Sequence, residues 1–237
     1  MVNNLPNLRI LPLNDLILHE EHDRQRTLPL VAKLRAQGIL RNPPIVMPLN
    51  DGTERFMVLD GANRVTSLQE MEFPHIVAQV VRVDDPHVNL QTWNHVVWGM
   101  NPKILMADVR KIKGLEIIKV DTHKSVDAPK YMPVQIRLPD GKLHMLIESP
   151  SELAEHIYTL HQIVNAYKTR ASLDRTSQTL VDSFKAIYPN LCALVVFPSF
   201  KIKTVLKLAG QNILLPTGIT RFTVSPRALH LNYPLHE

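Results

Sequence analysis

Apolar residues in the first 85 positions alternate between short continuous runs and helical spacings. The runs have strand length and are rich in β-branched residues. They cover residues 8–13, 45–47, 56–59 and 76–83. Helical spacing, which places residues on one face of a helix, joins Leu30, Val31 and Leu34, and then Val65, Leu68 and Met71. This part of the chain therefore predicts a compact α/β module.

The remainder of the chain mixes both patterns. Polar and apolar residues alternate on both sides of Asp140-Gly141, which predicts a hairpin over 132–147. We expect helices over about 153–168, 174–187 and 199–208, a buried strand over 193–197, and a short helix over 89–97. A boundary near 125–129 gives two predicted domains, 1–125 and a smaller mixed domain over 126–237.

Composition indicates a folded protein with no disulfide framework. The 237 residues are 45% hydrophobic and 21% charged, with a formal net charge of +5. This mild basic excess is compatible with nucleotides, small anions or nucleic acid. The one cysteine, Cys192, lies in an apolar run and is expected to be buried. No leader or membrane-spanning pattern is present, so we expect a cytoplasmic protein.

The stretch from Phe56 to Leu68 carries the strongest chemical signal. A strand, an Asp-Gly turn and a helix place the N–H groups of Ala62, Asn63 and Arg64 at a helix N-terminus, which suits a phosphate. Asp60, at the strand end, could hold Mg²⁺ beside that phosphate. The alternative is an ordinary Asp-Gly turn with a solvated arginine.

For the other candidate site residues, a purely structural role is at least as well supported as a functional one. Glu20 follows an apolar strand and suits a general base, or it lies in a solvated loop. Trp93 and His95 lie on the expected short helix, where packing is the default for Trp93 and a ligand wall is the sharper alternative. Thr220-Arg221 follows a glycine turn and suits an oxyanion, or lies on the surface. No Walker A loop, kinase Gly-rich loop or H-R-D loop is present, which excludes conventional ATPases and protein kinases.

Several of these motifs, in this order, resemble the ParB/sulfiredoxin superfamily and best of all its free L-serine kinase branch, which includes enzymes of staphyloferrin B-type siderophore synthesis. The likeness covers nearly the whole chain. It includes Leu18-His19-Glu20 with Arg26, the turn Asp60-Gly61-x-x-Arg64 with Thr66, Thr92-Trp93-x-His95, and Gly218 to Phe222 with Arg227. Ala62 stands where sulfiredoxins carry their catalytic cysteine, and Asn63 stands where the kinases usually have histidine. An amide there can bind phosphate oxygens but cannot carry charge or a proton.

The resemblance implies a kinase that transfers a phosphoryl group from ATP or ADP, with Mg²⁺, to the hydroxyl of free L-serine. It implies Glu20 and Asp60 as catalytic residues, with Asp60 also the metal ligand. The implied phosphate-binding residues are Gly61, Ala62, Asn63, Arg64, Thr66 and Arg26. The implied substrate-binding residues are Trp93, His95, Thr220 and Arg221.

A second hypothesis is a ParB-like nucleotide-binding regulator that acts on DNA without metabolic catalysis. The positive charge permits it, but the sequence contains no recognisable DNA-reading element. We therefore favour the kinase with serine and nucleotide as partners, without DNA or a membrane. The sequence leaves the oligomeric state open.

Overall fold

The computed structural model of the protein describes residues 5–22, 24–120, 134–148 and 152–235. The described chain divides into two compact units, each built from separate segments of sequence. The first unit comprises Met1–Leu90, Lys201–Thr217 and Phe222–Glu237, and the second comprises Gln91–Phe200 and Gly218–Arg221. The expected division at 125 is therefore wrong, because strand pairing joins residues 94–98 to later strands and the C-terminal segments pack with the N-terminal module.

A five-stranded sheet in the order β1-β6-β4-β5-β2 forms the centre of the first unit. Its strands are β1 (Leu8–Pro12), β2 (Leu16–Leu18), β4 (Ile45–Pro48), β5 (Phe56–Asp60) and β6 (His75–Val80). β2 and β5 run parallel with Leu18 opposite Val58, whereas β4 and β5 form an antiparallel hairpin. The sequence predicted these strands because each is an apolar run, and β4, β5 and β6 are largely buried.

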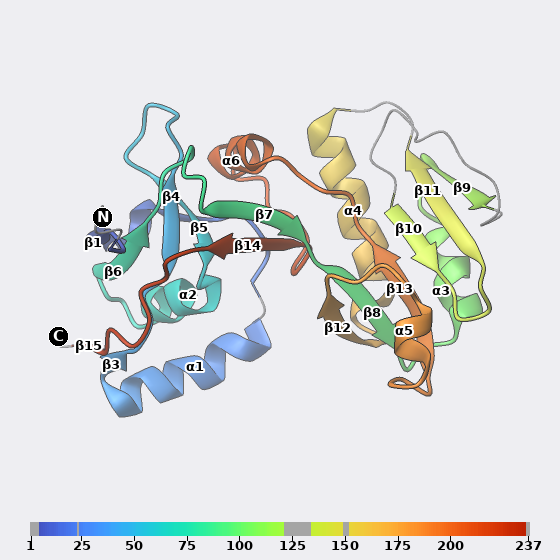
Figure 1. The fold of residues 1–237 in the computed structure, drawn as a ribbon, viewed down its shortest axis with the longest axis horizontal. Helices are drawn as coiled ribbons and strands as arrows, with labels where there is room; N and C mark the ends of the chain where they lie inside the picture. The colour runs from blue at the N-terminus through green and yellow to red at the C-terminus, as the bar shows by residue number, and fades with distance from the viewer. Residues whose placement is uncertain (1–4, 23, 121–133, 149–151, 236–237) are drawn as a thin grey trace. The chain divides into compact units, whose positions relative to one another are not determined.

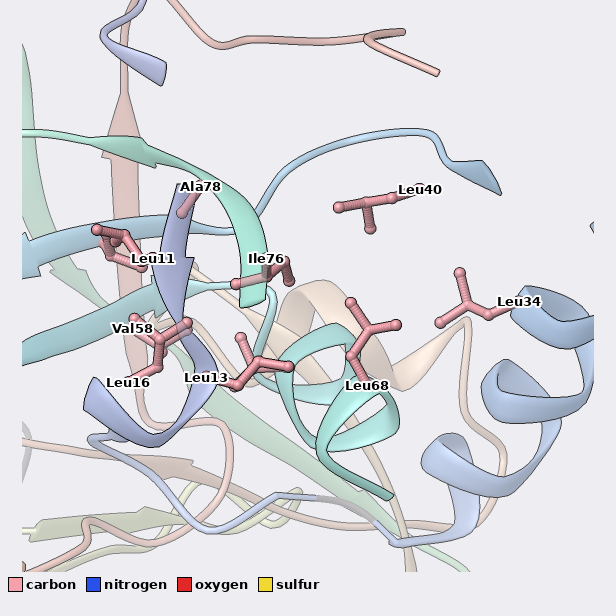
Figure 2. Close-up of a cluster of buried hydrophobic side chains, with 11 residues drawn as sticks. Leu11, Leu13, Leu16, Leu34, Leu40, Val58, Leu68, Ile76 and Ala78 are labelled. Carbon is pink, nitrogen blue, oxygen red and sulfur yellow. The ribbon is translucent and has the colours of Figure 1, made fainter. Parts of the chain in front are cut away.

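Helices α1 (Arg24–Gln37), α2 (Ala62–Glu70) and α6 (Ile202–Gly210) also belong to the first unit, as do the short helix η1 (Leu13–Asp15) and the paired strands β3 (Ile39–Leu40) and β15 (Tyr233–Pro234). Figure 2 shows the hydrophobic cluster where leucines of α1 and α2, Leu34 and Leu68, lie beside the sheet residues Val58, Ile76 and Ala78. α6 packs against β2 and β5. Gly38 ends α1 with a φ of +58°, as its position after the helical pattern predicted.

The second unit contains an antiparallel six-stranded sheet in the order β12-β8-β13-β10-β11-β9. Its strands are β8 (Asn94–Trp98), β9 (Leu115–Val120), β10 (Val134–Arg137), β11 (Leu143–Glu148), β12 (Ser172–Thr176) and β13 (Leu191–Val196). Its helices are α3 (Pro102–Val109), α4 (Leu153–Lys168) and α5 (Asp182–Lys185). β10 and β11 form the hairpin predicted around Asp140-Gly141.

Alternate residues of β8 face different helices of the second unit. The ring of His95 contacts Tyr167 of α4, whereas Val96 packs in a cluster with Phe184 of α5 and Leu194 of β13. Because the sheet is covered on both faces, β13 reads as a continuous apolar run rather than an alternation. Cys192 in β13 is buried, as expected, and burial raises its pKa to about 11.

One predicted helix is a pair of strands in the structure, and a second is helical over only four of its residues. Residues 89–97, expected to form one helix, belong to β7 (Val88–Thr92) and β8, and β7 pairs with β14 (Thr220–Val224). Residues 174–187 form the end of β12 and, separately, α5 (Figure 1). In both cases pairing with distant strands, β8 with β12 and β13, outweighs local spacing. The linker expected near 125–129 lies outside the described residues.

Candidate functional site

The turn after β5 has the strand–glycine–helix geometry that the sequence predicted. β5 ends at Asp60, Gly61 adopts a φ of +99°, and α2 begins at Ala62. A Cβ atom on Gly61 would lie 2.6 Å from Nη2 of Arg64 and 2.9 Å from Cβ of Pro44. Only glycine therefore satisfies both the backbone conformation and the space available at this position.

The first turn of α2 uses some of its N–H groups internally. The N–H groups of Arg64 and Val65 both donate to the carbonyl oxygen of Gly61, at 2.9 and 3.0 Å. The first N–H groups of a helix otherwise have no partner within that helix. The N–H groups of Ala62 and Asn63 are therefore the ones that the helix presents to an anion, whereas that of Arg64 is already engaged.

Three charged side chains meet beside this turn. Nη2 of Arg64 lies 3.4 Å from Oδ2 of Asp60, and the same oxygen also accepts a hydrogen bond from Nη2 of Arg227. Burial lowers the pKa of Arg64, Asp60 opposes this, and the neighbouring charge of Arg227 adds to the lowering. Two guanidinium groups and one carboxylate leave a net positive charge at the helix N-terminus, which favours an anionic ligand.

Arg227 is a site residue to which sequence reasoning assigned no role. It was noted only as part of the C-terminal motif, and 167 positions separate it from Asp60. A local pattern carries no signal of such a contact. The pairing of β15 with β3, which returns the C-terminal segment to the first unit, provides the missing information.

Two buried polar atoms near the turn have no hydrogen-bond partner within the described part of the chain. They are Nε of Arg64 and Oγ1 of Thr66, both in α2. Buried donors without a partner are costly, so each suits a ligand that supplies acceptor oxygens. A phosphate group is such a ligand. Arg26 lies in α1, but its side chain is outside the described residues.

Glu20 lies at the same sheet edge as Asp60. Since β2 and β5 are neighbouring parallel strands with Leu18 opposite Val58, Glu20 and Asp60 each lie two residues beyond that paired position, toward the carboxyl ends of the strands. Both residues are half-buried. His19 fixes the start of the loop, because its Nδ1 lies 2.6 Å from the carbonyl oxygen of Val58 and its ring packs edge-on against Phe222. The fold thus brings the two candidate catalytic carboxylates to one sheet edge of the first unit.

The candidate substrate residues Trp93, Thr220 and Arg221 meet in the second unit. The N–H of Trp93 donates to the carbonyl oxygen of Ile219, and the Arg221 guanidinium lies 4.4 Å from the centre of the indole ring. This cation–π contact orients the guanidinium. Thr220 is buried beside it in the sequence. The arrangement offers a charged, planar group of the kind that recognises carboxylates.

His95, by contrast, is fully buried, and both of its ring nitrogens are engaged within the protein. Nδ1 lies 2.7 Å from the hydroxyl of Tyr167, and Nε2 lies 3.0 Å from the carbonyl oxygen of Gly218. Burial lowers its pKa to about 4, which outweighs the opposing hydrogen bond to Gly218. The ring is therefore neutral and holds Gly218 in place.

The guanidinium of Arg175 in β12, another residue that sequence reasoning missed, lies close to Gly218. Gly218 has a φ of +76°, and a Cβ at this position would clash with Nε of Arg175. Arg175 lies directly opposite His95 in the β12–β8 pairing. This pair of contacts fixes the start of the 218–221 segment, and only the strand pairing reveals it.

The described residues contain no group of three or more His, Cys, Asp or Glu side chains arranged to hold a metal ion. A divalent cation at Asp60 would therefore be bound by that carboxylate together with oxygens of a bound nucleotide. Mg²⁺ commonly binds in this way, through one or two carboxylates and substrate phosphates. In the part of the chain that the structure describes, no helix has the length and hydropathy needed to cross a membrane.

Comparison with known proteins extends the resemblance to whole chains. No protein-family model matches this chain. It is 24% identical over 233 residues to the ATP-dependent L-serine kinase SbnI of Staphylococcus aureus, covering 97% of this chain and 83% of the relative. It is 28% identical over 118 residues to an ATP-dependent L-serine kinase of Staphylothermus marinus, covering 50% of this chain and 44% of that protein.

Solved structures give the same result for the fold. C-terminally truncated SbnI from Staphylococcus aureus matches with a TM-score of 0.77 and 21% identity, over 96% of this chain and 87% of that chain. A free serine kinase in complex with AMP also matches with a TM-score of 0.77, at 13% identity, over 99% of this chain and 96% of that chain. The chain is similar over nearly its whole length to an L-serine kinase in sequence and to free serine kinases in fold. The predicted α/β fold class is confirmed.

Proposed function

We propose that this protein is an ATP-dependent kinase that converts free L-serine to O-phospho-L-serine. The names of its relatives support the proposal, as does one observation in the first unit. Asp60 ends β5 and Glu20 follows β2, so both lie at the carboxyl ends of neighbouring parallel strands. Phosphoryl transfer needs chiefly a base for the acceptor hydroxyl and charge stabilisation for the phosphates. Glu20 is the candidate base, and Asp60 with its neighbouring arginine Arg64 can provide the charge stabilisation.

In the proposed reaction, the serine hydroxyl oxygen forms a bond to the γ-phosphorus of ATP while the bond from that phosphorus to the β–γ bridging oxygen breaks. The hydroxyl proton passes to the carboxylate of Glu20, and ADP leaves with the bridging oxygen. Arg64 and the N–H groups of Ala62 and Asn63 bind phosphate oxygens, and the amide of Asn63 provides a neutral contact where the related kinases usually have histidine. Thr66 and Arg26 complete the proposed phosphate side.

Asp60 is the proposed Mg²⁺ ligand. When bound, Mg²⁺ neutralises charge on the phosphates and favours attack at phosphorus. Arg227 and Arg64, which share the Asp60 carboxylate, hold its side chain in place.

On the serine side, we propose that the Arg221 guanidinium binds the substrate carboxylate and that Trp93 and Thr220 line the site. His95 acts indirectly, by fixing Gly218 through its hydrogen bond. Because an arginine–carboxylate pair is geometrically specific, amino alcohols that lack the carboxylate should be poor acceptors.

The deciding experiment incubates the purified protein with L-serine, Mg²⁺ and either ATP or ADP, and measures O-phospho-L-serine by mass spectrometry. We expect product with ATP, and no product with either nucleotide would refute the proposal. Glu20→Gln should lower kcat by roughly 100-fold or more, since a general base contributes about that much. Glu54→Gln, which removes an exposed carboxylate from the β4–β5 turn of the same unit, is the matched control and should retain wild-type kcat.

A further inference from the structure

The loop that carries Glu20 is held by a segment from the far end of the sequence. β2 is the edge strand of its sheet, so the residues that follow it lie at an edge of the sheet. Residues 214–217, which we call the strap, pair along this loop. Glu20 and Leu215 form a parallel bridge, the N–H of Leu215 donates to the carbonyl oxygen of His19 at 2.8 Å, and the N–H of Glu21 donates to that of Leu215 at 3.0 Å.

Thr217 adds a side-chain contact to this pairing. Its hydroxyl donates to the carbonyl oxygen of Glu21 at 2.8 Å, in a half-buried position. The backbone on both sides of Glu20 is thus bound: the His19 carbonyl by Leu215, and the N–H and carbonyl of Glu21 by Leu215 and Thr217. The His19 ring is held separately by Val58. With its neighbours fixed, Glu20 has little freedom to rotate its backbone.

The strap is itself firmly anchored in the first unit. Leu215 is completely buried, and α6, which precedes the strap, packs against β2 and β5. The end of α6 is also tied to the β4–β5 turn, because Nη2 of Arg55 donates to the carbonyl oxygen of Gly210 at 3.2 Å. An anchored strap can impose a fixed position on the loop that it pairs with.

We infer that Thr217 is a positioning residue for the general base: its hydrogen bond to the Glu21 carbonyl holds the Glu20 carboxylate where it can accept the serine proton. The inference rests on the proposed kinase function. Proton transfer requires the base within hydrogen-bond reach of the hydroxyl, so a small shift of the backbone at Glu20 and Glu21 costs rate without changing substrate affinity. The strap is followed directly in the sequence by Gly218–Arg221, which carries residues proposed for serine binding.

The test compares Thr217→Val, which removes the hydroxyl but keeps the shape, with Thr217→Ser, which keeps the hydroxyl. We expect Thr217→Val to lower kcat roughly 5- to 10-fold, the effect of one lost hydrogen bond, with the KM values for serine and ATP unchanged. Thr217→Ser should restore most of the rate. Thr204→Val on α6, a half-buried threonine of the same unit, is the control and should keep wild-type kinetics.

A double variant separates positioning from general destabilisation. If Thr217 acts through Glu20, adding Thr217→Val to Glu20→Ala should lower the residual rate no further. Hydrogen exchange provides a readout that does not depend on activity: the amide of Glu21, bound to Leu215, should exchange several-fold faster in Thr217→Val than in wild type.

Each outcome bears on the inference separately from the kinase proposal. Wild-type kcat in Thr217→Val, a KM increase in place of a kcat loss, or a full additional loss in the Glu20→Ala background would overturn the positioning role while leaving the kinase function intact. Unchanged exchange at Glu21 would also overturn it. Absence of phosphoserine from the wild-type protein would refute the kinase function and, with it, the role assigned to Thr217.

Discussion

Replacing Gly61 with alanine provides a direct test of the phosphate turn. Gly61 has a φ of +99°, and an added Cβ would approach Nη2 of Arg64 to 2.6 Å and Cβ of Pro44 to 2.9 Å. Gly52, in the β4–β5 turn of the same unit, is the matched control. Its φ is +88°, but nothing lies within 4 Å of its added Cβ. The two variants share the backbone strain and differ in the steric conflict.

The expected losses of stability follow from the backbone strain and from the steric conflict. An alanine in the left-handed region costs about 1–2 kcal/mol, so Gly52→Ala should destabilise the protein by about that amount. Gly61→Ala adds the conflict with Pro44, whose ring cannot rotate away, and overpacking of this kind costs about 1–3 kcal/mol more. At this chain length that difference corresponds to a further fall in Tm of roughly 3–10 °C.

The measurement is thermal unfolding of both variants beside the wild type, together with ATP binding by calorimetry. Because the added methyl displaces the Arg64 guanidinium from Asp60, Gly61→Ala should also bind ATP at least 10-fold more weakly, whereas Gly52→Ala should bind it normally. Equal losses of stability in the two variants, or unimpaired ATP binding by Gly61→Ala, would show that this account of the turn is wrong.

Two further predictions concern the second unit. The pKa of His95 is lowered to about 4 from an ordinary value of 6.5, so the unfolded chain binds more protons between these two pH values; the free energy of unfolding should therefore fall by about 2 kcal/mol from pH 7 to pH 5 and level off below pH 4. In urea unfolding, His95→Gln should lose this pH dependence, while His75→Gln, at an exposed site, should retain it. In Gly218→Ala the added Cβ would clash with Arg175, so this variant should raise the KM for serine at least several-fold. It should also lower Tm more than Gly99→Ala, whose added Cβ has no heavy atom within 4 Å. A KM equal to that of wild type would contradict the role of the 218–221 segment.

The candidate phosphate turn could be predicted from the sequence because its determinants are local. Asp60, Gly61 and Arg64 lie within five consecutive positions, and the apolar run before them and the helical spacing after them specify strand and helix directly. The same locality explains why the hairpin around Asp140-Gly141 and the end of α1 at Gly38 were predicted. Each of these elements depends on neighbours a few residues away.

Contacts between residues far apart in the sequence could be determined only from the tertiary structure. The pattern over 89–97 predicts a helix, but these residues belong to strands β7 and β8. In the helix predicted over 174–187, residues 174–176 belong to β12. In both segments the pairing partners lie far away in the sequence. The contacts of His95 could not be predicted for the same reason: its hydrogen bonds with Tyr167 and Gly218 join residues 72 and 123 positions apart.

The sequence by itself determined the fold class, the relatives and the residue types available for phosphate chemistry. The tertiary structure decided that Arg227 shares the carboxylate of Asp60, that Thr217 holds the loop of Glu20, and that the C-terminal segments return to the first unit. The physical reason is that backbone conformation and amphipathic spacing are encoded by near neighbours, whereas ion pairs and strand pairing depend on which distant segments burial brings together.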